Sequence, residues 1–355
     1  MKLLGQHVPQ ARSVATRRRY SAIAFGSLVA AMALAAAGCS SGGNATAAIA
    51  LAGATSNSGE LSSNVAGNYQ IVTLNDARDE TFNQLLGIND QGVIAGYFGS
   101  GAARHPNKGY ALVPPFAQRE FLNENFPGSA QTQVTGLNDH GVTVGFWSTQ
   151  DTASMTNNNF GFYWLNGRFH NVNFPVDDNA SPPVNQLLGV NNSGIAVGFY
   201  TNNGGLNRGY EYDIWTRRFT RVEVPGNFNG TAGPSLTAAA INNDGDVSGF
   251  YNKTSTQVDA FLKLRSGAFI TLAYPGATAT QAAGVNDSDE VVGSYTTGTG
   301  NAAVTRGFTW HGGKYASVNI KGSSSTTVNG INDEGDLVGF YTDAKGNTDG
   351  FLGLP

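Results

Sequence analysis

The sequence predicts an all-β fold, a six-bladed β-propeller of four-stranded blades. Three observations support this prediction: a phrase that recurs six times, a texture dense in aromatic and β-branched residues with many glycines, and matching strands near the two ends of the chain. The phrases begin at residues 87, 136, 189, 240, 284 and 330, so the repeat lengths are 49, 53, 51, 44 and 46 residues. Such a period suits a propeller blade, which takes about 40 to 50 residues.

Each repeat divides into four strands, A to D from the axis outward. The motif Asn-Asp/Asn-x-Gly between strands A and B predicts a hairpin turn. Asn and Asp tolerate the left-handed backbone conformation, and Gly adopts a positive φ without steric cost. In the fifth repeat Asp289 replaces this glycine. Strand C opens with a small residue and then an aromatic one, at 109–113, 161–165, 209–213, 260–264, 307–310 and 350–354.

Strand D indicates how the ring closes. Five D strands are expected near 120–126, 168–174, 218–224, 268–274 and 314–320, one fewer than six phrases require. The last repeat ends after its C strand at Pro355, whereas an isolated strand precedes the first phrase at 69–74. We therefore expect one N-terminal strand to pair with three C-terminal strands, which removes exposed sheet edges. An open β-solenoid, the rival architecture, leaves the first strand unexplained.

The N-terminal segment predicts export. Five Lys and Arg residues precede an apolar stretch at 21–37 that is short for a membrane span, and Cys39 follows as the only cysteine. Residues 36–39, Ala-Ala-Gly-Cys, resemble the lipobox of bacterial lipoproteins. We expect a lipoprotein signal peptide at 1–38, then lipidated Cys39 and a flexible tether at 39–67, rich in Ser, Gly and Ala, before the propeller at 68–355. The alternative is a secreted protein with an incidental cysteine, and the export route, Sec or twin-arginine, stays open.

Charge and cysteine content limit the partners. The chain has 21 Lys+Arg and 25 Asp+Glu, and removal of residues 1–38 takes away five basic residues, leaving a formal charge of about −9. No basic cluster remains to displace counterions from phosphates, so a nucleic-acid partner is not expected. A single cysteine also excludes an internal disulfide.

The repeated phrase resembles the bacterial extracellular repeats of the HAF family. Gly-Ile-Asn-Asp-x-Gly-x-Val-Val-Gly, a Gly-Phe strand and an aromatic strand ending in Pro-Gly carry the resemblance, which covers residues 68–355. The His-Ala-Phe triplet of that family is mostly replaced, by Lys-Gly-Tyr at 108–110 and Arg-Gly-Phe at 306–308, with Asp-Ala-Phe at 259–261. The resemblance implies an exported propeller-like protein and transfers no catalytic residue.

Local motifs for chemistry are few. The sequence has no H-E-x-x-H, P-loop, G-x-S-x-G or dinucleotide fingerprint, so we expect no metal, cofactor or nucleotide. Five acids in or beside the A–B turns lack the spacing of an EF-hand, and we interpret them as hairpin residues. They are Asp90, Asp139, Asp244, Asp287 and Asp333.

One set of side chains is a candidate ligand site. Six uncharged polar residues stand three positions before each phrase: Gln84, Gln133, Gln186, Thr237, Gln281 and Thr327. If the A strands line the channel, these amides and hydroxyls form a ring suited to a sugar or ordered water. The alternative is that they satisfy buried backbone groups.

The aromatic pairs that close each phrase are expected to pack between blades. Trp147 is the exception, because it borders a long polar loop at 148–159, and we name it as a candidate platform for stacking on a glycan.

These observations predict an exported, lipid-anchored propeller on the cell envelope, at the outer membrane or cell surface in a Gram-negative cell. We expect a non-catalytic binding or scaffolding module for a glycan or an envelope protein. One alternative is a carbohydrate- or lactone-acting enzyme, with loop acids such as Asp151, Asp177, Asp178 and Asp343 at a channel mouth; that alternative rests on fold analogy. The other is a purely structural envelope protein.

Overall fold

The computed structural model describes residues 64–102, 104–150, 158–226 and 233–355. These residues form 25 strands and two short 3-10 helices, Gln118–Glu120 and Gly300–Ala302. Within these ranges no helix is long and apolar enough to cross a membrane. The predicted lipidation site Cys39 and the loop acid Asp151 lie outside the described residues.

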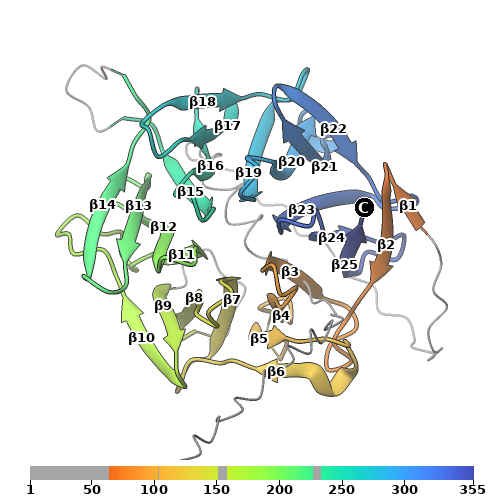
Figure 1. Ribbon diagram of the computed structural model, residues 1–355, viewed down its shortest axis with the longest axis horizontal. Coiled ribbons are helices and arrows are strands. Elements are labelled where there is room, and N and C mark those ends of the chain that lie inside the picture. Colours follow the sequence, from red (N-terminus) through yellow and green to blue (C-terminus); the bar gives the residue numbers. More distant parts are fainter. Residues whose placement is uncertain (1–63, 103, 151–157, 227–232) are drawn as a thin grey trace, which may run out of the picture.

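The strands form six antiparallel four-stranded units around one axis, as predicted (Figure 1). Blade 1 consists of β3 (Asn83–Ile88), β4 (Ile94–Phe98), β5 (Lys108–Leu112) and β6 (Phe121–Asn123). Blade 2 consists of β7 (Gln131–Leu137), β8 (Thr143–Ser148), β9 (Phe160–Leu165) and β10 (Arg168–Val172). Blade 3 consists of β11 (Asn185–Val190), β12 (Ile195–Thr201), β13 (Asn207–Asp213) and β14 (Arg218–Val222).

The other three blades repeat this order. Blade 4 consists of β15 (Leu236–Ile241), β16 (Val247–Asn252), β17 (Val258–Lys263) and β18 (Phe269–Leu272). Blade 5 consists of β19 (Ala279–Val285), β20 (Val291–Thr297), β21 (Val304–His311) and β22 (Lys314–Val318). Blade 6 consists of β23 (Ser325–Ile331), β24 (Leu337–Thr342), β25 (Thr348–Leu354) and β2 (Tyr69–Thr73). A single parallel pair, Val258 with Ala279, joins blades 4 and 5 into one continuous sheet.

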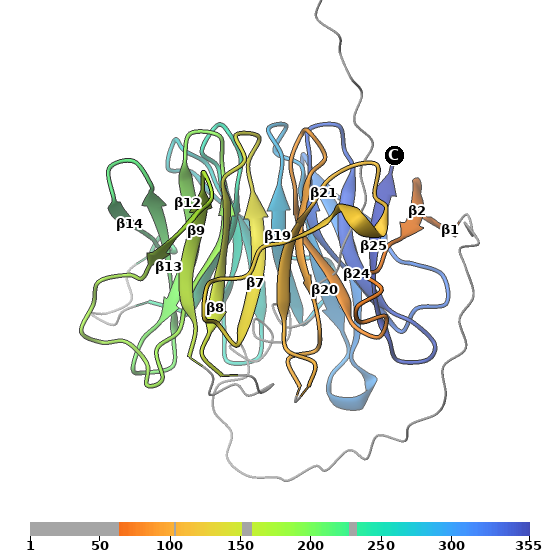
Figure 2. The same cartoon turned by 90° about the horizontal axis from the view of Figure 1, so that it is seen from below.

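The ring closes through the two ends of the chain. Strand β2 pairs antiparallel with β25, so that Gln70 lies opposite Leu354 and Thr73 opposite Phe351. The orange β2 therefore completes the blue C-terminal blade in Figures 1 and 2. A further strand, β1 (Asn64–Ala66), pairs with β2. The domain thus extends four residues beyond the predicted start at 68, because the predicted tether already contains this strand.

Every A strand carries a bulge just before its phrase. In blade 1 the pairing of β3 with β4 shifts between Leu85 and Gly87, and the shift recurs at the same place in the other five blades. One extra residue per blade therefore turns toward the axis. These residues are Leu86, Thr135, Leu188, Ala239, Ala283 and Asn329.

The glycine that opens the phrase permits close packing at the axis. A Cβ added to Gly136 would lie 2.6 Å from the carbonyl oxygen of Leu188 and 3.0 Å from Cα of Gly189. The opening glycines of the other blades meet their neighbours similarly, and blade 4 alone has alanine, Ala240, at this position. The inner strands can approach this closely because these residues lack a side chain.

Aromatic side chains fill the space between blades. Tyr97, Phe146 and Phe250 are buried, as predicted for the pairs that close each phrase. All three belong to one buried cluster that contains residues from several blades.

Candidate functional site

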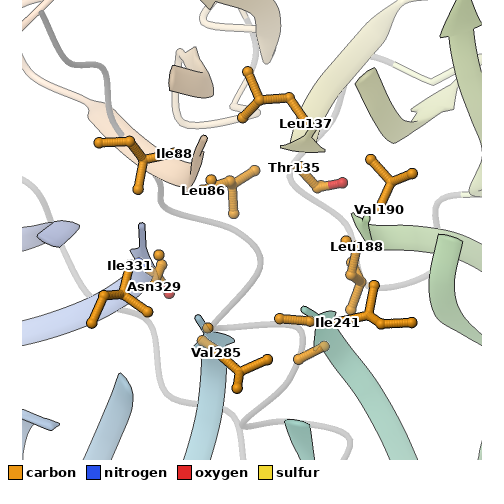
Figure 3. A pocket seen from close by; sticks show the side chains of 18 residues that line it. Leu86, Ile88, Thr135, Leu137, Leu188, Val190, Ile241, Val285, Asn329 and Ile331 are labelled. Carbon is orange, nitrogen blue, oxygen red and sulfur yellow. The ribbon is translucent and has the colours of Figure 1, made fainter. Parts of the chain in front are cut away.

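The axial channel is narrow and mostly apolar (Figure 3). The bulge residues and the second residue of each phrase line a cavity of about 80 Å³. Thr135 is one of its polar side chains, and its hydroxyl donates to the carbonyl of Leu187 at 2.7 Å. Asn329 is another, and its side-chain nitrogen is buried without a protein partner. The channel offers little room for a ligand larger than water.

The turn asparagines form a closed ring of hydrogen bonds at one end of this channel. Each side-chain amide donates to the main-chain carbonyl of the equivalent asparagine in the next blade. The pairs are Asn89 to Asn138 (3.0 Å), Asn138 to Asn191 (2.9 Å), Asn191 to Asn242 (3.0 Å), Asn242 to Asn286 (3.1 Å), Asn286 to Asn332 (3.2 Å) and Asn332 to Asn89 (3.5 Å). These bonds join all six blades at the axis.

The next residue of each phrase forms a second closed ring. Its main-chain N–H donates to the side-chain oxygen of its counterpart one blade further on. The acceptors in order are Asp139, Asn192, Asn243, Asp287, Asp333 and Asp90, at 2.7–3.0 Å. The hairpin interpretation of these acids is therefore incomplete, since four of the five also join neighbouring blades; Asp244 lies one residue further on and outside this ring.

The second ring concentrates negative charge. Asp287, Asp333, Asp90 and Asp139 are consecutive members, and they surround the channel mouth with Asn192 and Asn243. Burial, and then repulsion from the neighbouring carboxylates, raises the pKa of Asp90 to about 6. Burial also raises the pKa of Asp333. In the described ranges no group of three or more His, Cys, Asp or Glu side chains is arranged to hold a metal ion.

The predicted polar ring lies elsewhere. Its six members are buried and are not among the side chains that line the channel. Gln133 donates to Asn107 of blade 1 at 2.9 Å, Gln186 donates to Asn159 of blade 2 at 2.9 Å, and Thr237 accepts from Asn207 of blade 3 at 3.1 Å. Gln84 accepts from Tyr97 at 3.4 Å. The bulge explains this placement, because the extra residue changes which side chains face the axis.

The other members of that ring, Gln281 and Thr327, are likewise buried. The predicted platform Trp147 is half-buried and stacks on Phe126, with ring centroids 4.4 Å apart, while its indole N–H donates to Asn171 at 2.9 Å. Trp147 therefore packs against the outer strands and presents no free ring face on that side. Of the loop acids, Asp177, Asp178 and Asp343 line neither the channel nor the cleft described next.

A larger cavity opens between blades 1 and 2. It has a volume of about 530 Å³, within the range of ligand sites. It begins beside the axial rings at Asn138 and Asp139 and ends at Leu122, Trp164 and Phe169 on the outer strands. We call this cavity the interblade cleft.

Glu124 is the buried titratable group of the interblade cleft. It follows β6, where its N–H donates to the carbonyl of Gly109 at 2.9 Å, and 8% of the residue is exposed. Its carboxyl accepts a hydrogen bond from the hydroxyl of Thr143, the first residue of β8 in blade 2. Burial raises the pKa of Glu124 to about 7, and the Thr143 hydrogen bond opposes this rise. A carboxyl of this kind is poised to donate or accept a proton at neutral pH.

The repeat shows that this polar pair is exceptional. Glu124 occupies a position that is apolar in the other five blades: Leu74, Val172, Val222, Leu272 and Val318. Thr143 occupies a position that is also apolar in the other five: Ile94, Ala196, Val247, Val291 and Leu337. At each of those interfaces the two apolar residues lie in one hydrophobic cluster. The fold therefore does not require the carboxyl.

The remaining lining suits a sugar. Gln91 supplies an exposed amide, and the rings of Trp164 and Phe169 supply apolar surface. The amides of Asn89 and Asn125 also line the cleft, each with its nitrogen already donating to a main-chain carbonyl. Among the described residues that line the interblade cleft, none is Lys or Arg. A neutral carbohydrate fits this lining better than an anionic one, which the nearby acids would repel.

A second carboxylate, Asp139, lines the same cleft. Its two oxygens accept from the N–H of Asp90 at 3.0 Å and from the side-chain amide of Asn192 at 2.7 Å. Its neighbour His140 also lines the cleft and contacts the carbonyl of Asn192 through Nδ1 at 3.1 Å.

Sequence reasoning missed Glu124. Its signal was present as the single acidic residue at a position that is apolar in every other repeat.

Comparison with known proteins finds similarity among solved structures alone. No protein-family model matches the chain, and no curated protein matches it. Among solved structures, Trypanosoma rangeli sialidase in complex with DANA is 9% identical, with 81% of this chain and 60% of that chain covered and a TM-score of 0.47. A polysaccharide lyase of family PL25, an ulvan lyase, is 12% identical, covering 76% and 78%, with a TM-score of 0.41. The β-propeller domain of the trilobed protease from Pyrococcus furiosus is 13% identical, covering 67% of each chain, with a TM-score of 0.40.

The sheet topology of the chain makes it a β-propeller, and the names of two of these propellers bear on one expectation. We expected the protein not to be an enzyme, yet two of the similar propellers are by name a sialidase and a polysaccharide lyase. That expectation is withdrawn. At this identity the likeness concerns the fold alone, so the case for an activity rests on the interblade cleft.

Proposed function

We propose that the protein is a carbohydrate-acting enzyme that hydrolyses a neutral polysaccharide in the interblade cleft. The observation that carries the proposal is the buried carboxyl of Glu124, with a pKa of about 7, inside a cavity of about 530 Å³. Glycoside hydrolysis needs a carboxylic acid that is still protonated near neutrality to protonate the leaving oxygen. Burial among apolar residues supplies that acid here.

Each side chain then has a defined task. Glu124 donates its proton to the glycosidic oxygen as the bond from that oxygen to the anomeric carbon breaks, and Asp139 stabilises the positive charge that develops on the sugar ring. A water molecule then adds to the anomeric carbon and gives up a proton, which restores the acid form of Glu124. Trp164 and Phe169 bind the apolar face of the sugar. Elimination from an anionic sugar is a weaker alternative, because it needs a group that neutralises the sugar carboxylate, and no Lys or Arg is present among the described lining residues.

The test measures reducing ends released from xylan, galactomannan and mixed-linkage β-glucan. E124Q, which keeps the size of the side chain, should lower kcat about 100-fold or more. D139N should lower it as well without disrupting the ring, because Asn192 and Asn243 already occupy equivalent positions. E290Q in the A–B turn of blade 5 is the matched control, and it should retain full activity.

The pH profile provides a second readout. Activity should fall as pH rises through about 7, since Glu124 loses the proton that it donates. The proposal fails if none of the three polysaccharides is cleaved, or if E124Q retains wild-type activity.

We further propose that the enzyme is exported and anchored to the cell envelope through a lipid on Cys39, as an extracellular protein of the HAF repeat type. The five basic residues and the apolar stretch that precede Cys39 support this proposal. Labelled palmitate should enter the wild-type protein in cells and not C39A; equal labelling of both would exclude this anchor.

A further inference from the structure

An exposed tryptophan lies on the same face of the propeller as the interblade cleft. Trp215 is 63% exposed, the largest exposed fraction among the large apolar side chains of the described chain. It belongs to the turn between β13 and β14 in blade 3. The N–H of Ile214 in this turn donates to the carbonyl of Gly194 in the A–B turn at 3.1 Å, so both turns lie at one end of the blade.

The Trp215 ring is fixed although it is exposed. Its indole N–H donates to the carbonyl of Ser193 at 3.0 Å, and its main-chain N–H donates to the Asp213 side chain at 2.9 Å. Gly194 lies against the ring, since a Cβ added there would be 2.4 Å from Nε1. A flat ring held in one orientation loses little entropy when a ligand stacks on it.

Contacts connect this ring to the interblade cleft. His140 lines the cleft, and its Nδ1 contacts the carbonyl of Asn192 at 3.1 Å. Asn192 precedes Ser193, whose carbonyl holds Trp215. The A–B turn of blade 3 therefore lies between His140 at the cleft and the tryptophan.

We infer that Trp215 is a distal saccharide-binding position, so that the substrate is a polymer extending from the interblade cleft to blade 3. The inference rests on the proposed function and specifies its substrate as a chain rather than a short oligosaccharide. The exposed ring face stacks on the C–H face of a sugar, as aromatic platforms do for flat or apolar ligand faces.

Native gels containing galactomannan, xylan or β-glucan test the inference, together with initial rates on each polymer and on its tetrasaccharide. W215A should weaken retention by the polymer about tenfold and raise KM for the polymer by a similar factor. Its rate on the tetrasaccharide should change by less than twofold, and W215F should restore most of the retention. L206A is the matched control, because Leu206 is another exposed apolar side chain, in the loop between β12 and β13.

The outcomes separate the two proposals. If W215A binds and cleaves the polymer like the wild type, the distal position is rejected while the proposed function stands. A further gel contains polygalacturonate, an anionic polymer. If the protein is retained by that gel alone, the positive charges of Arg217 and Arg218, which follow Trp215 in the chain, explain the retention and the stacking inference is rejected. If the wild type neither binds nor cleaves any polymer, the proposed function fails and the inference fails with it.

Discussion

Replacing Glu124 with glutamine should remove a pH-dependent loss of stability. The folded-state pKa of about 7 lies above the ordinary value of 4.5, so the folded protein holds this proton more tightly than the unfolded chain. The resulting stabilisation is complete below about pH 4.5 and is lost as pH rises through about 7. At 1.36 kcal/mol per pKa unit the full effect is about 3 kcal/mol, of which about 2.5 kcal/mol falls between pH 5 and pH 8.

Urea unfolding of the wild type and E124Q at both pH values measures this effect. The stability difference between the two proteins should shift by about 2.5 kcal/mol in favour of E124Q at the higher pH, because other titrating groups cancel in the comparison. A second variant, E124L/T143V, copies the apolar pair found at the other interfaces and should exceed the wild type at pH 8 by at least about 3 kcal/mol. An unchanged difference between the wild type and E124Q would show that burial does not keep the carboxyl neutral, and it would remove the basis for Glu124 as a proton donor.

Two further predictions concern the axis. D90N copies the asparagines that already occupy the second ring, and it should stabilise the protein by about 1 kcal/mol above pH 6 and not at all below pH 4. The raised pKa of Asp90 costs stability only when the carboxyl is ionised, and the value of about 1 kcal/mol allows for solvent screening. Urea unfolding at several pH values measures the effect. G136A should lower the free energy of unfolding by about 1–3 kcal/mol, because the added Cβ would meet the Leu188 carbonyl. A240G, at the equivalent position of blade 4, should change the melting temperature little. Equal effects of the two variants would contradict the close packing of the inner strands.

The fold could be predicted because the same strand and turn pattern recurs in six repeats. Strand order, the hairpin turns and the closure of the ring follow from spacing and turn chemistry, and pairing of β2 with β25 confirms the closure. The side chains at the axis could not be placed this way. The bulge residues have no common identity, as Leu86, Thr135 and Asn329 show, so the sequence does not reveal where the alternation of side chains shifts.

The hydrogen bonds between the turns of neighbouring blades could not be predicted from the sequence for a similar reason. Asn89 and Asp90 satisfy the rules for a hairpin turn, and a single repeat gives no sign that both also bind the next blade. Only the closed ring brings the six turns within hydrogen-bond distance of one another. The concentration of acids at the channel mouth follows from that closure.

The repeat provides an internal standard for recognising a site. At five of the six interfaces between blades, two apolar side chains pack against each other at this position. The polar pair at the sixth interface is therefore not needed for the fold. At that interface a carboxyl remains buried at a cost of about 3 kcal/mol above neutral pH, and a hydroxyl opposite it lowers the cost only in part. The same interface contains the cavity of about 530 Å³. One of six equivalent positions thus combines an unfavourable buried group, a polar partner for it and a cavity large enough for a ligand. Chemistry at Glu124 explains this combination better than packing does.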